Sequence, residues 1–368
     1  MPIRAGGRYY RAMTEAHLIK TAIVGASGYS GEELVHLLLK HPHAELTAIT
    51  SRRYAGLTLA QVFPKFASLP HARELKFSEP NPDLVAQKAT VAFLALPHGV
   101  SSEMAVPLLE KGCRVIDLSA DFRLKSAAVY KEFYGHDHPS PHLLAQSVYG
   151  LPEIYRGKIT QAALVASPGC YPTSILLPVI PLLRARLIQP STIIADSLSG
   201  VSGAGRKAEL DYLFVECHES MRPYGLPKHR HLSEIEQELS LAADQTVVIQ
   251  FTPHLIPVNR GILSTIYLTP ASPLEDDESQ GRYLAQVTEY FHMAYDGEPF
   301  VRVLDGKALP DTKNVVGTNV LEFAWRLDPR TGRLIVMSAV DNIVKGASGQ
   351  AVQSYNLMFG FPETAGLL

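Results

Sequence analysis

At 368 residues the chain is too long for one ordinary hydrophobic core, so we expect two domains. Its net charge of -2 excludes an electrostatic case for binding nucleic acid or an anionic membrane surface, and its apolar runs are far shorter than the roughly 18 residues of a membrane span. Three widely separated cysteines exclude a disulfide framework and indicate reduced thiols in the cytoplasm.

The first twelve residues carry three arginines and no acidic residue, and a second methionine follows at Met13. No apolar segment follows these charges, which argues against a targeting peptide. We expect a disordered basic tail, or translation that starts at Met13, and a fold that begins near Leu18.

The first half of the chain alternates short apolar runs with helical stretches. The runs that predict strands are 21–25, 46–51, 91–96, 114–119 and 163–168, and "GEELVHLLLKH" (31–41) has leucines at helical spacing. Nearly continuous apolar strands separated by helices are typical of a parallel sheet covered on both faces. This pattern predicts a doubly wound α/β domain of the Rossmann type over residues 18–168.

A glycine-rich turn lies at the first junction between strand and helix. Gly25, Gly28 and Gly31 have the spacing G-x-x-G-x-x-G rather than the usual G-x-G-x-x-G. Small residues there let the backbone approach a pyrophosphate, which the helix N-terminus favours. We interpret the turn as a dinucleotide site, although any tight turn of this kind favours glycine.

The end of the second predicted strand indicates which dinucleotide binds. An NAD site usually has an acidic residue there for the ribose 2′-hydroxyl, but this strand ends with Ser51, Arg52 and Arg53. A hydroxyl and two guanidinium groups suit a 2′-phosphate, so we predict NADP. The alternative is a solvated basic loop.

Cys170 lies in "VASPGCYPTSILLP" (165–178), between a predicted strand and a helix with a proline-interrupted middle. A helix N-terminus offers free N–H groups and a positive dipole end, conditions that lower the pKa of a thiol. Cys170 is therefore the predicted nucleophile, against the alternative of a buried filler cysteine. Cys113 fits that alternative, and Cys217 is ambiguous.

Beyond residue 187 strands dominate, at 192–200, 247–256, 262–270, 320–327 and 333–342. Short turns between some of them are typical of antiparallel neighbours. We predict a second, α+β mixed-sheet domain over residues 169–342. The last stretch, 343–368, is predicted to form a helix.

The segment "KHRHLSEIEQEL" (228–239) holds the best candidates for a proton donor and acceptor. His229 and His231 precede a predicted helix that carries Glu234. Histidines at alternate positions of an extended chain point opposite ways, so only one is expected to face the site. A basic surface flank of the helix is the alternative.

Two further glycine-rich loops follow predicted strands. "DSLSGVSGAGRK" (196–207) has backbone N–H groups for a phosphate or cofactor, and it is equally compatible with a flexible linker. "DNIVKGASGQAVQ" (341–353) opens an apolar helix and predicts an anion or nicotinamide contact, or a simple helix start.

These segments together resemble the N-acetyl-gamma-glutamyl-phosphate reductases of arginine biosynthesis. The matching stretches run from "GASGYSGEEL" through "TSRRYAG", "LALPHG", "VIDLSADFRL", "YGLPE", "SPGCYPT", "SGVSGAG", "KHRHLSEIEQ" and "FTPHLIPVNRGI" to "DNIVKGASGQAVQ". The wider group includes aspartate-semialdehyde dehydrogenase. The resemblance implies a Rossmann domain, a catalytic domain with the oligomer contacts of a homodimer or homotetramer, and a C-terminal helix that returns to the first domain.

The resemblance also implies roles for individual residues. Cys170 matches the nucleophile, His231 is preferred over His229 as acid/base, and Glu234 is expected to orient or support the histidine. The implied cofactor contacts are Gly25, Ser27, Gly28, Tyr29, Ser30, Gly31, Ser51, Arg52, Pro97, His98, Asn342 and Gly346. For the substrate we expect Ser199, Gly200, Ser202 and Arg206 at the phosphate, and Arg123 at a carboxylate or else in a structural salt bridge. No metal is expected.

The implied reaction is NADPH-dependent reduction of N-acetyl-L-glutamyl 5-phosphate to N-acetyl-L-glutamate 5-semialdehyde through a thioester on Cys170. One alternative is the same chemistry on a carrier-protein-linked aminoadipyl phosphate in lysine biosynthesis, and a weaker one uses aspartyl phosphate. An alternative of another class is a non-catalytic NADP-binding sensor.

Overall fold

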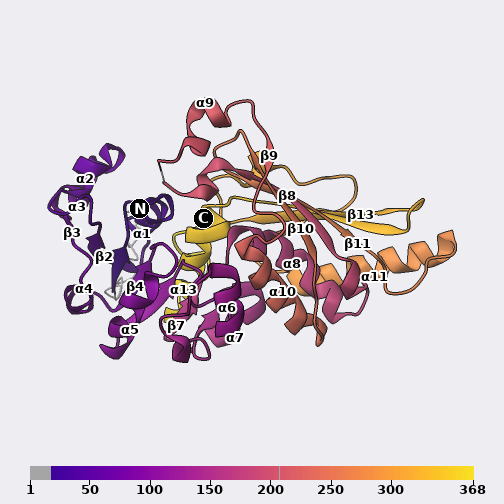
Figure 1. Cartoon of the computed structure of the whole chain (residues 1–368), viewed down its shortest axis with the longest axis horizontal. Coiled ribbons are helices and arrows are strands. Elements are labelled where there is room, and N and C mark those ends of the chain that lie inside the picture. Colours follow the sequence, from indigo (N-terminus) through magenta and orange to yellow (C-terminus); the bar gives the residue numbers. More distant parts are fainter. Residues whose placement is uncertain (1–17, 207) are drawn as a thin grey trace, which may run out of the picture.

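The computed structural model describes residues 18–206 and 208–368, so the expectations for the N-terminal tail and Met13 lie outside the described residues. The chain forms two seven-stranded sheets (Figure 1). Both the predicted Rossmann-type α/β fold and the predicted α+β fold with a mixed sheet are present. Among the described residues, no helix is long and apolar enough to cross a membrane.

The first sheet is parallel throughout, in the order β3-β2-β1-β4-β5-β7-β6. Its strands are β1 (Ile19–Val24), β2 (Ala44–Thr50), β3 (Phe77–Ser78), β4 (Val91–Leu94), β5 (Arg114–Asp117), β6 (Val148–Tyr149) and β7 (Leu164–Ala166). The strand order reverses between β1 and β4. In open α/β sheets ligands bind in the crevice at such a reversal, beyond the carboxyl ends of the strands.

Helices cover both faces of this sheet. They are α1 (Tyr29–Leu38), α2 (Leu59–Val62), α3 (Pro70–Glu74), α4 (Pro82–Lys88), α5 (Ser101–Glu110), α6 (Ala127–Tyr134) and α7 (Pro152–Ile159). Alternate strand residues enter separate cores: Ile23 and Phe93 pack on one side, and Val24 and Leu94 on the other. Burial on both faces explains why these strands are almost continuously apolar.

Helix α8 (Cys170–Arg184) runs without interruption through Pro178 and Pro181. A proline lacks the N–H that would bond the carbonyl four residues earlier. The two freed carbonyls find side chains instead: Ser174 accepts from the Ser338 hydroxyl at 2.7 Å, and Leu177 accepts from the Tyr295 hydroxyl. Tertiary contacts therefore replace the helical bonds that the prolines remove.

The second sheet is mixed, in the order β12-β13-β14-β11-β8-β10-β9. Its strands are β8 (Ile194–Gly200), β9 (Arg222–Pro223), β10 (Gln250–Ile256), β11 (Ile262–Leu268), β12 (Val301–Val303), β13 (Leu321–Asp328) and β14 (Arg333–Val340). Of the consecutive strands joined by short turns, β13 and β14 are antiparallel neighbours as predicted, whereas β8 lies between β10 and β11. Strand β11 is antiparallel to both β8 and β14, and β8 is parallel to β10. Helices α8, α10 (Arg230–Ala243) and α11 (Asp277–Tyr295) lie on one face, and short helices α9 (Phe214–Cys217) and α12 (Thr312–Val315) lie in connections (Figure 1).

The chain ends with a π-helical turn (Val344–Ser348) and α13 (Gly349–Phe359). Val352 and Tyr355 of α13 pack in the same core as Ile23 and Leu34, and the Tyr355 hydroxyl donates to the carbonyl of His43 at 3.0 Å. The C-terminal helix thus contributes to the core of the first sheet. The domain limits themselves stay a prediction.

Candidate active site

The glycine-rich turn follows β1 at the reversal of strand order. Gly25 has φ +90°, and a Cβ there would lie 2.3 Å from the carbonyl oxygen of Ala95. A Cβ on Gly31 would lie 2.4 Å from the Gly25 oxygen, whereas around Gly28 the nearest atom is 3.8 Å away. Packing therefore requires two of the glycines, and the third leaves the N-terminus of α1 uncovered, which suits an anionic group.

The residues predicted for the 2′-phosphate lie beside this turn. The hydroxyls of Ser27 and Ser51 are 2.9 Å apart, which joins the turn to the end of β2. Arg52 is exposed and forms no ion pair with any described residue, while Arg53 lies over the ring of Tyr54. The side chains present therefore fit a dinucleotide with a phosphorylated ribose.

Cys170 is the first residue of α8, and Gly169 is its N-cap. Desolvation raises the pKa of Cys170 to about 11, although the N–H of Tyr171 and the charge of Arg123 act in the opposite direction. The expected lowering of this pKa is thus wrong for the free protein. Loss of water around the half-buried thiol outweighs the helix start.

His229 and His231 lie at the start of α10 rather than in an extended chain. His229 is the N-cap, and its Nδ1 accepts from the N–H of His231 at 3.1 Å. Their ring centroids are only 5.0 Å apart, so the expectation that they point opposite ways is wrong. Turning of the backbone at the cap brings both rings to the same side.

Of the two histidines, His231 packs directly on the turn that carries the cysteine. A Cβ on Gly169 would lie 2.6 Å from Nε2 of His231. Burial lowers the pKa of His231 well below its usual value, with the charges of His229 and Arg123 acting in the same direction. Burial also lowers the pKa of His229 to about 4. Both rings are therefore neutral near pH 7.

Glu234 does not bond to His231 as expected. Its buried carboxylate accepts from the N–H of Gly169 at 2.8 Å, from the Tyr149 hydroxyl at 2.6 Å, and from Arg123 at 3.1 Å. One helical turn after His231, Glu234 thus holds the turn before the cysteine. A side chain three residues along a helix has its own long-range partners, which local spacing does not reveal.

Arg123 is itself buried, and its charge is used inside the protein. Besides the ion pair with Glu234, Nε donates to the carbonyl of Ser167 at 2.7 Å and Nη2 to that of Leu118 at 2.9 Å. The structural salt bridge anticipated as the alternative is the arrangement found. A direct contact with a substrate carboxylate is not supported.

The two later glycine loops converge near the cysteine. A Cβ on Gly346 would lie 2.8 Å from Cβ of Cys170. Asn342 accepts from the N–H of Gly261 at 2.8 Å and donates to the Ser202 hydroxyl at 2.9 Å. These contacts bring the loop after β8 and the π-helical turn together.

Other members of the predicted set have specific locations. Ser199 and Gly200 end β8, Pro97 and His98 follow β4, and Tyr29 and Ser30 begin α1. Arg206, expected at the substrate phosphate, instead pairs with Glu32 of α1 and lies over the ring of Tyr29, with 4.8 Å between the guanidinium carbon and the ring centroid. The loop extends far enough across to meet the first domain.

Sequence reasoning missed Tyr224. Its hydroxyl lies 2.9 Å from that of Tyr171, and its ring meets His229 at 5.4 Å between centroids. Tyr171 could have been noticed because it follows the cysteine, whereas nothing local marks Tyr224. It arrives from a segment more than 50 residues away.

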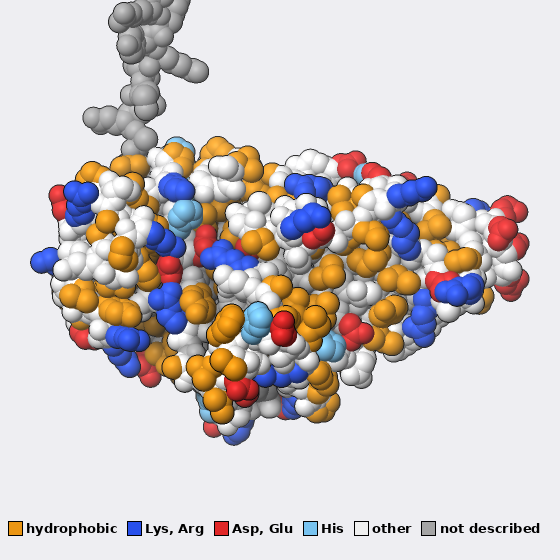
Figure 2. Space-filling model, turned by 90° about the horizontal axis from the view of Figure 1, so that it is seen from above, with side chains coloured by type: hydrophobic (Ala, Val, Ile, Leu, Met, Phe, Trp, Pro, Cys, Tyr) orange, Lys and Arg blue, Asp and Glu red, His pale blue; other side chains and the backbone are white. Residues whose placement is uncertain are grey.

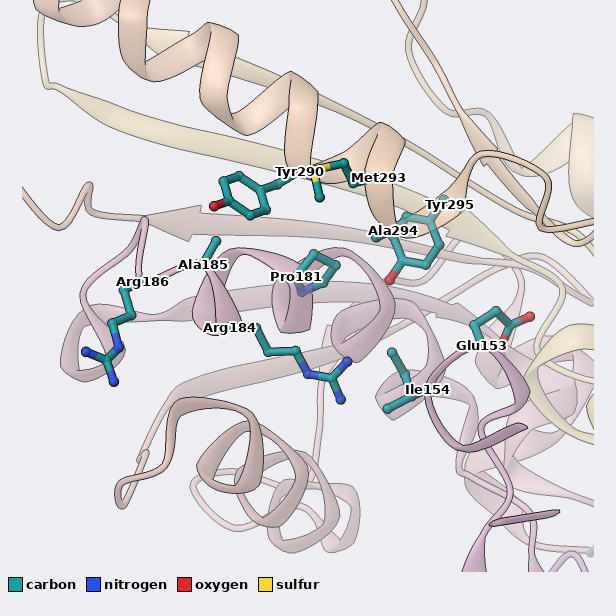
Figure 3. Close-up of a pocket in the computed structure, with 10 residues that line it drawn as sticks. All are labelled: Glu153, Ile154, Pro181, Arg184, Ala185, Arg186, Tyr290, Met293, Ala294 and Tyr295. Carbon is teal, nitrogen blue, oxygen red and sulfur yellow. The ribbon is translucent and has the colours of Figure 1, made fainter. Parts of the chain in front are cut away.

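A cavity of about 400 Å³ lies elsewhere, between α7, the end of α8 and α11 (Figure 3). Arg184, Tyr290 and Met293 are among the residues that line it. None of the predicted site residues does. This cavity is separate from the arrangement around Cys170.

Comparison with known proteins matches two domain families. Residues 20–162 match the family described as "Semialdehyde dehydrogenase, NAD binding domain", and residues 170–342 match "Semialdehyde dehydrogenase, dimerisation domain". The N-acetyl-gamma-glutamyl-phosphate reductase of Akkermansia muciniphila is 56% identical over 95% of this chain and 98% of its own length. The enzyme of the same name from Moorella thermoacetica is 51% identical over the same shares.

Solved structures show the same fold. Aspartate semialdehyde dehydrogenase II from Vibrio cholerae superposes with a TM-score of 0.69 at 16% identity, covering 93% of this chain and 99% of its own. Aspartate semialdehyde dehydrogenase from Candida albicans, solved with NADP, has a TM-score of 0.68 at 16% identity, covering 93% and 98%. At this identity the likeness extends to the fold alone.

Proposed function

The chain belongs to the N-acetyl-gamma-glutamyl-phosphate reductases, built from the two semialdehyde dehydrogenase domains, and we propose on this basis that it makes N-acetyl-L-glutamate 5-semialdehyde for arginine biosynthesis. The substrates are N-acetyl-L-glutamyl 5-phosphate and NADPH, and inorganic phosphate and NADP⁺ are the other products. The observation that carries the chemistry is Cys170 at the start of α8, with His231 packed on the preceding glycine.

Acylation begins from a neutral thiol and a neutral imidazole, because burial raises the pKa of Cys170 and lowers that of His231. As the sulfur attacks the acyl carbon, His231 takes the thiol proton. The C–O bond to phosphate then breaks with its electron pair, phosphate leaves, and a thioester remains on Cys170. This covalent step divides one difficult reduction into two easier reactions.

NADPH, when bound, supplies the hydride that reduces the thioester carbonyl. The uncovered N-terminus of α1 at Gly28, with Ser51 and Arg52, would hold this cofactor. His231 then returns its proton to the thiohemiacetal oxygen during reduction, and collapse of that group releases the aldehyde and the thiol. For the substrate phosphate we retain Ser199 and Gly200, which end β8, and Ser202 on the following loop, whose hydroxyl accepts from Asn342.

The reverse reaction tests this function. N-acetyl-L-glutamate 5-semialdehyde, phosphate and NADP⁺ should give NADPH, seen at 340 nm, and Cys170→Ser should abolish turnover while NADPH still binds. Near-normal turnover by the serine variant would refute the covalent route.

Cofactor choice has its own test at Arg52. Arg52→Gln removes a charge-assisted hydrogen bond to the 2′-phosphate, which is worth about 1.5–3 kcal/mol. We expect KM for NADPH to rise about tenfold or more and KM for NADH to stay unchanged. Arg53→Gln is the matched neighbour, and an equal effect of both variants would point to general basic charge instead.

The named relatives favour neither a carrier-linked aminoadipyl substrate nor a non-catalytic sensor. The aspartate enzymes resemble the chain at only 16% identity, which gives no reason to prefer aspartyl phosphate. A cytoplasmic location accords with Cys113, Cys170 and Cys217, all of which are free.

Oligomer formation accords with the dimerisation-domain match. We infer a homodimer through the sheet face opposite α8, α10 and α11. Leu334 and Val336 of β14 point into the core, which places the partly exposed Ile335 and Met337 on that other face. Exposed hydrophobic residues near α9 extend the apolar character of this side, where Figure 2 shows hydrophobic side chains among polar ones.

A further inference from the structure

The segment Asp117–Arg123 begins at the last residue of β5 and lies between two loops of the proposed site. It is part of the stretch "VIDLSADFRL". Asp117 and Asp121 are completely buried, and Arg123 is 5% exposed. Burying a charged group costs free energy unless the group is paired or hydrogen-bonded. The partners of these three charged side chains therefore indicate what each of them holds in place.

Asp121 holds the loop that follows β4. Its carboxylate accepts from the N–H of Gly99 at 2.7 Å, from that of Ser102 at 3.2 Å, and from the Tyr130 hydroxyl at 3.1 Å. Helix α5 has Val100 at its N-cap and no side-chain cap of its own. Asp121 therefore provides, from about 20 residues away, the acceptor that a helix N-terminus needs.

The preceding residue adds a bond to the same loop. The N–H of Ala120 donates to Nδ1 of His98 at 3.0 Å, so this ring nitrogen acts as the acceptor. The charge of His98 also contributes to lowering the pKa of His231, which indicates that the two rings lie in the same region. The backbone and the ring of the His98 loop are thus both fixed by Ala120 and Asp121.

Arg123 holds the other loop, two residues further on. It donates to the carbonyl of Ser167 and pairs with Glu234, whose other oxygen accepts from the N–H of Gly169. The backbone on the N-terminal side of Cys170 is therefore attached to Arg123 both directly and through Glu234.

We propose that Asp121 and Arg123 are positioning residues that set the Pro97–His98 loop in register with Cys170. Hydride transfer requires reacting atoms about 3–3.5 Å apart, and a 1 Å displacement can cost about 10²-fold in rate. Two side chains one residue apart, each fastened to a different loop, fix that separation through a single short piece of backbone. The inference rests on the proposed function, which gives the His98 loop its contact with NADPH.

Asp121→Asn tests the first half. The amide keeps the size of the carboxylate but has one acceptor oxygen, so one of the two backbone N–H groups loses its partner. We expect Kd for NADPH, from fluorescence titration, to rise about tenfold and kcat to fall about tenfold, because the displaced loop misplaces the cofactor for hydride transfer. Alkylation of Cys170 by iodoacetamide, followed on its peptide by mass spectrometry, should stay at the wild-type rate.

Asp117→Asn is the matched control. Asp117 is as deeply buried, but its partners are the hydroxyls of Ser101 and Ser119 and the N–H of Ser119, so it reaches α5 only through a side chain and accepts from neither backbone N–H that Asp121 holds. Its Kd for NADPH should rise less than about threefold. Tyr130→Phe, which removes only one donor to Asp121, is a milder second variant and should raise Kd about two- to threefold.

Arg123→Lys tests the second half with the opposite pattern. Lysine keeps a positive charge for Glu234 but lacks the planar fork that also reaches Ser167 and Leu118. We expect kcat to fall about tenfold and the rate of Cys170 alkylation to differ about tenfold from that of the wild type. Kd for NADPH should stay unchanged.

The outcomes separate this inference from the function beneath it. If Asp121→Asn and Asp117→Asn alter NADPH affinity and alkylation by the same factors, the residues are merely structural and the inference is overturned. If Tyr130→Phe and Asp121→Asn both bind NADPH like the wild type, the inference alone is wrong. A wild-type enzyme that does not bind NADPH would refute the proposed function, and this inference with it.

Discussion

At the scale of single residues, the site depends on how burial sets two proton affinities. The thiol of Cys170 has a raised pKa and the imidazole of His231 a lowered one, so neither is charged near neutral pH. A neutral thiol is a weaker nucleophile than a thiolate. In the proposed mechanism the proton therefore moves as the sulfur attacks the acyl phosphate.

The raised pKa of the Cys170 thiol predicts how its alkylation depends on pH. Burial disfavours the thiolate, so the reactive fraction is small at pH 7 and rises with pH toward a pKa of about 11. The iodoacetamide rate of the free enzyme should therefore keep rising from pH 7 to pH 10. A plateau below pH 8, measured on the Cys170 peptide, would show instead that the helix start outweighs desolvation.

At the scale of elements, the site is a contact between the starts of α8 and α10. His231 occupies the space where Gly169 lacks a side chain. The close approach explains the glycine before the cysteine better than any need for flexibility, because its φ of -71° is accessible to every residue.

Gly169→Ala should therefore damage catalysis through His231. The new Cβ would lie 2.6 Å from Nε2 and displace the ring, and loss of an acid/base costs about 10²–10⁴-fold in kcat. NADPH binding should be unaffected. Gly157→Ala in α7, where no atom lies within 4 Å, is the control that should retain full activity.

Helix α8 gives a second prediction, on stability. Ser338→Ala leaves the Ser174 carbonyl, freed by Pro178, without its partner, at a cost of about 1–3 kcal/mol in the free energy of unfolding. Adding Pro178→Ala restores an N–H to that carbonyl and should recover much of the loss. Denaturant titrations of both single variants and the double variant measure this coupling, and strict additivity would contradict it.

At the scale of the whole molecule, the second sheet has helices on one face only among the described elements. Met337→Lys places a charge on the opposite face, where a partner subunit would cover it. We expect light scattering to show a monomer for this variant and a dimer for the wild type. Arg333→Lys is the conservative control. It changes the partly exposed first residue of the same strand and should leave the dimer intact.

The sequence alone determined the two fold classes, the strands that hold the nucleotide turn, and the place of Cys170 at a helix start. These features depend on hydrophobic periodicity, glycine and proline, whose effects extend over a few residues. Four strands of two or three residues were not predicted, β3, β6, β9 and β12, since such short strands leave almost no pattern in the sequence.

Only the tertiary structure decided what each charged group does. Glu234 bonds to Gly169 rather than His231, Arg123 is internal, and Arg206 reaches across to α1. Each of these partners is 40 or more residues distant in the chain, and the pKa of Cys170 depends on how much water the assembled fold leaves around it. Local sequence places a side chain at the end of an element, but the packing of distant elements sets its partners and its charge.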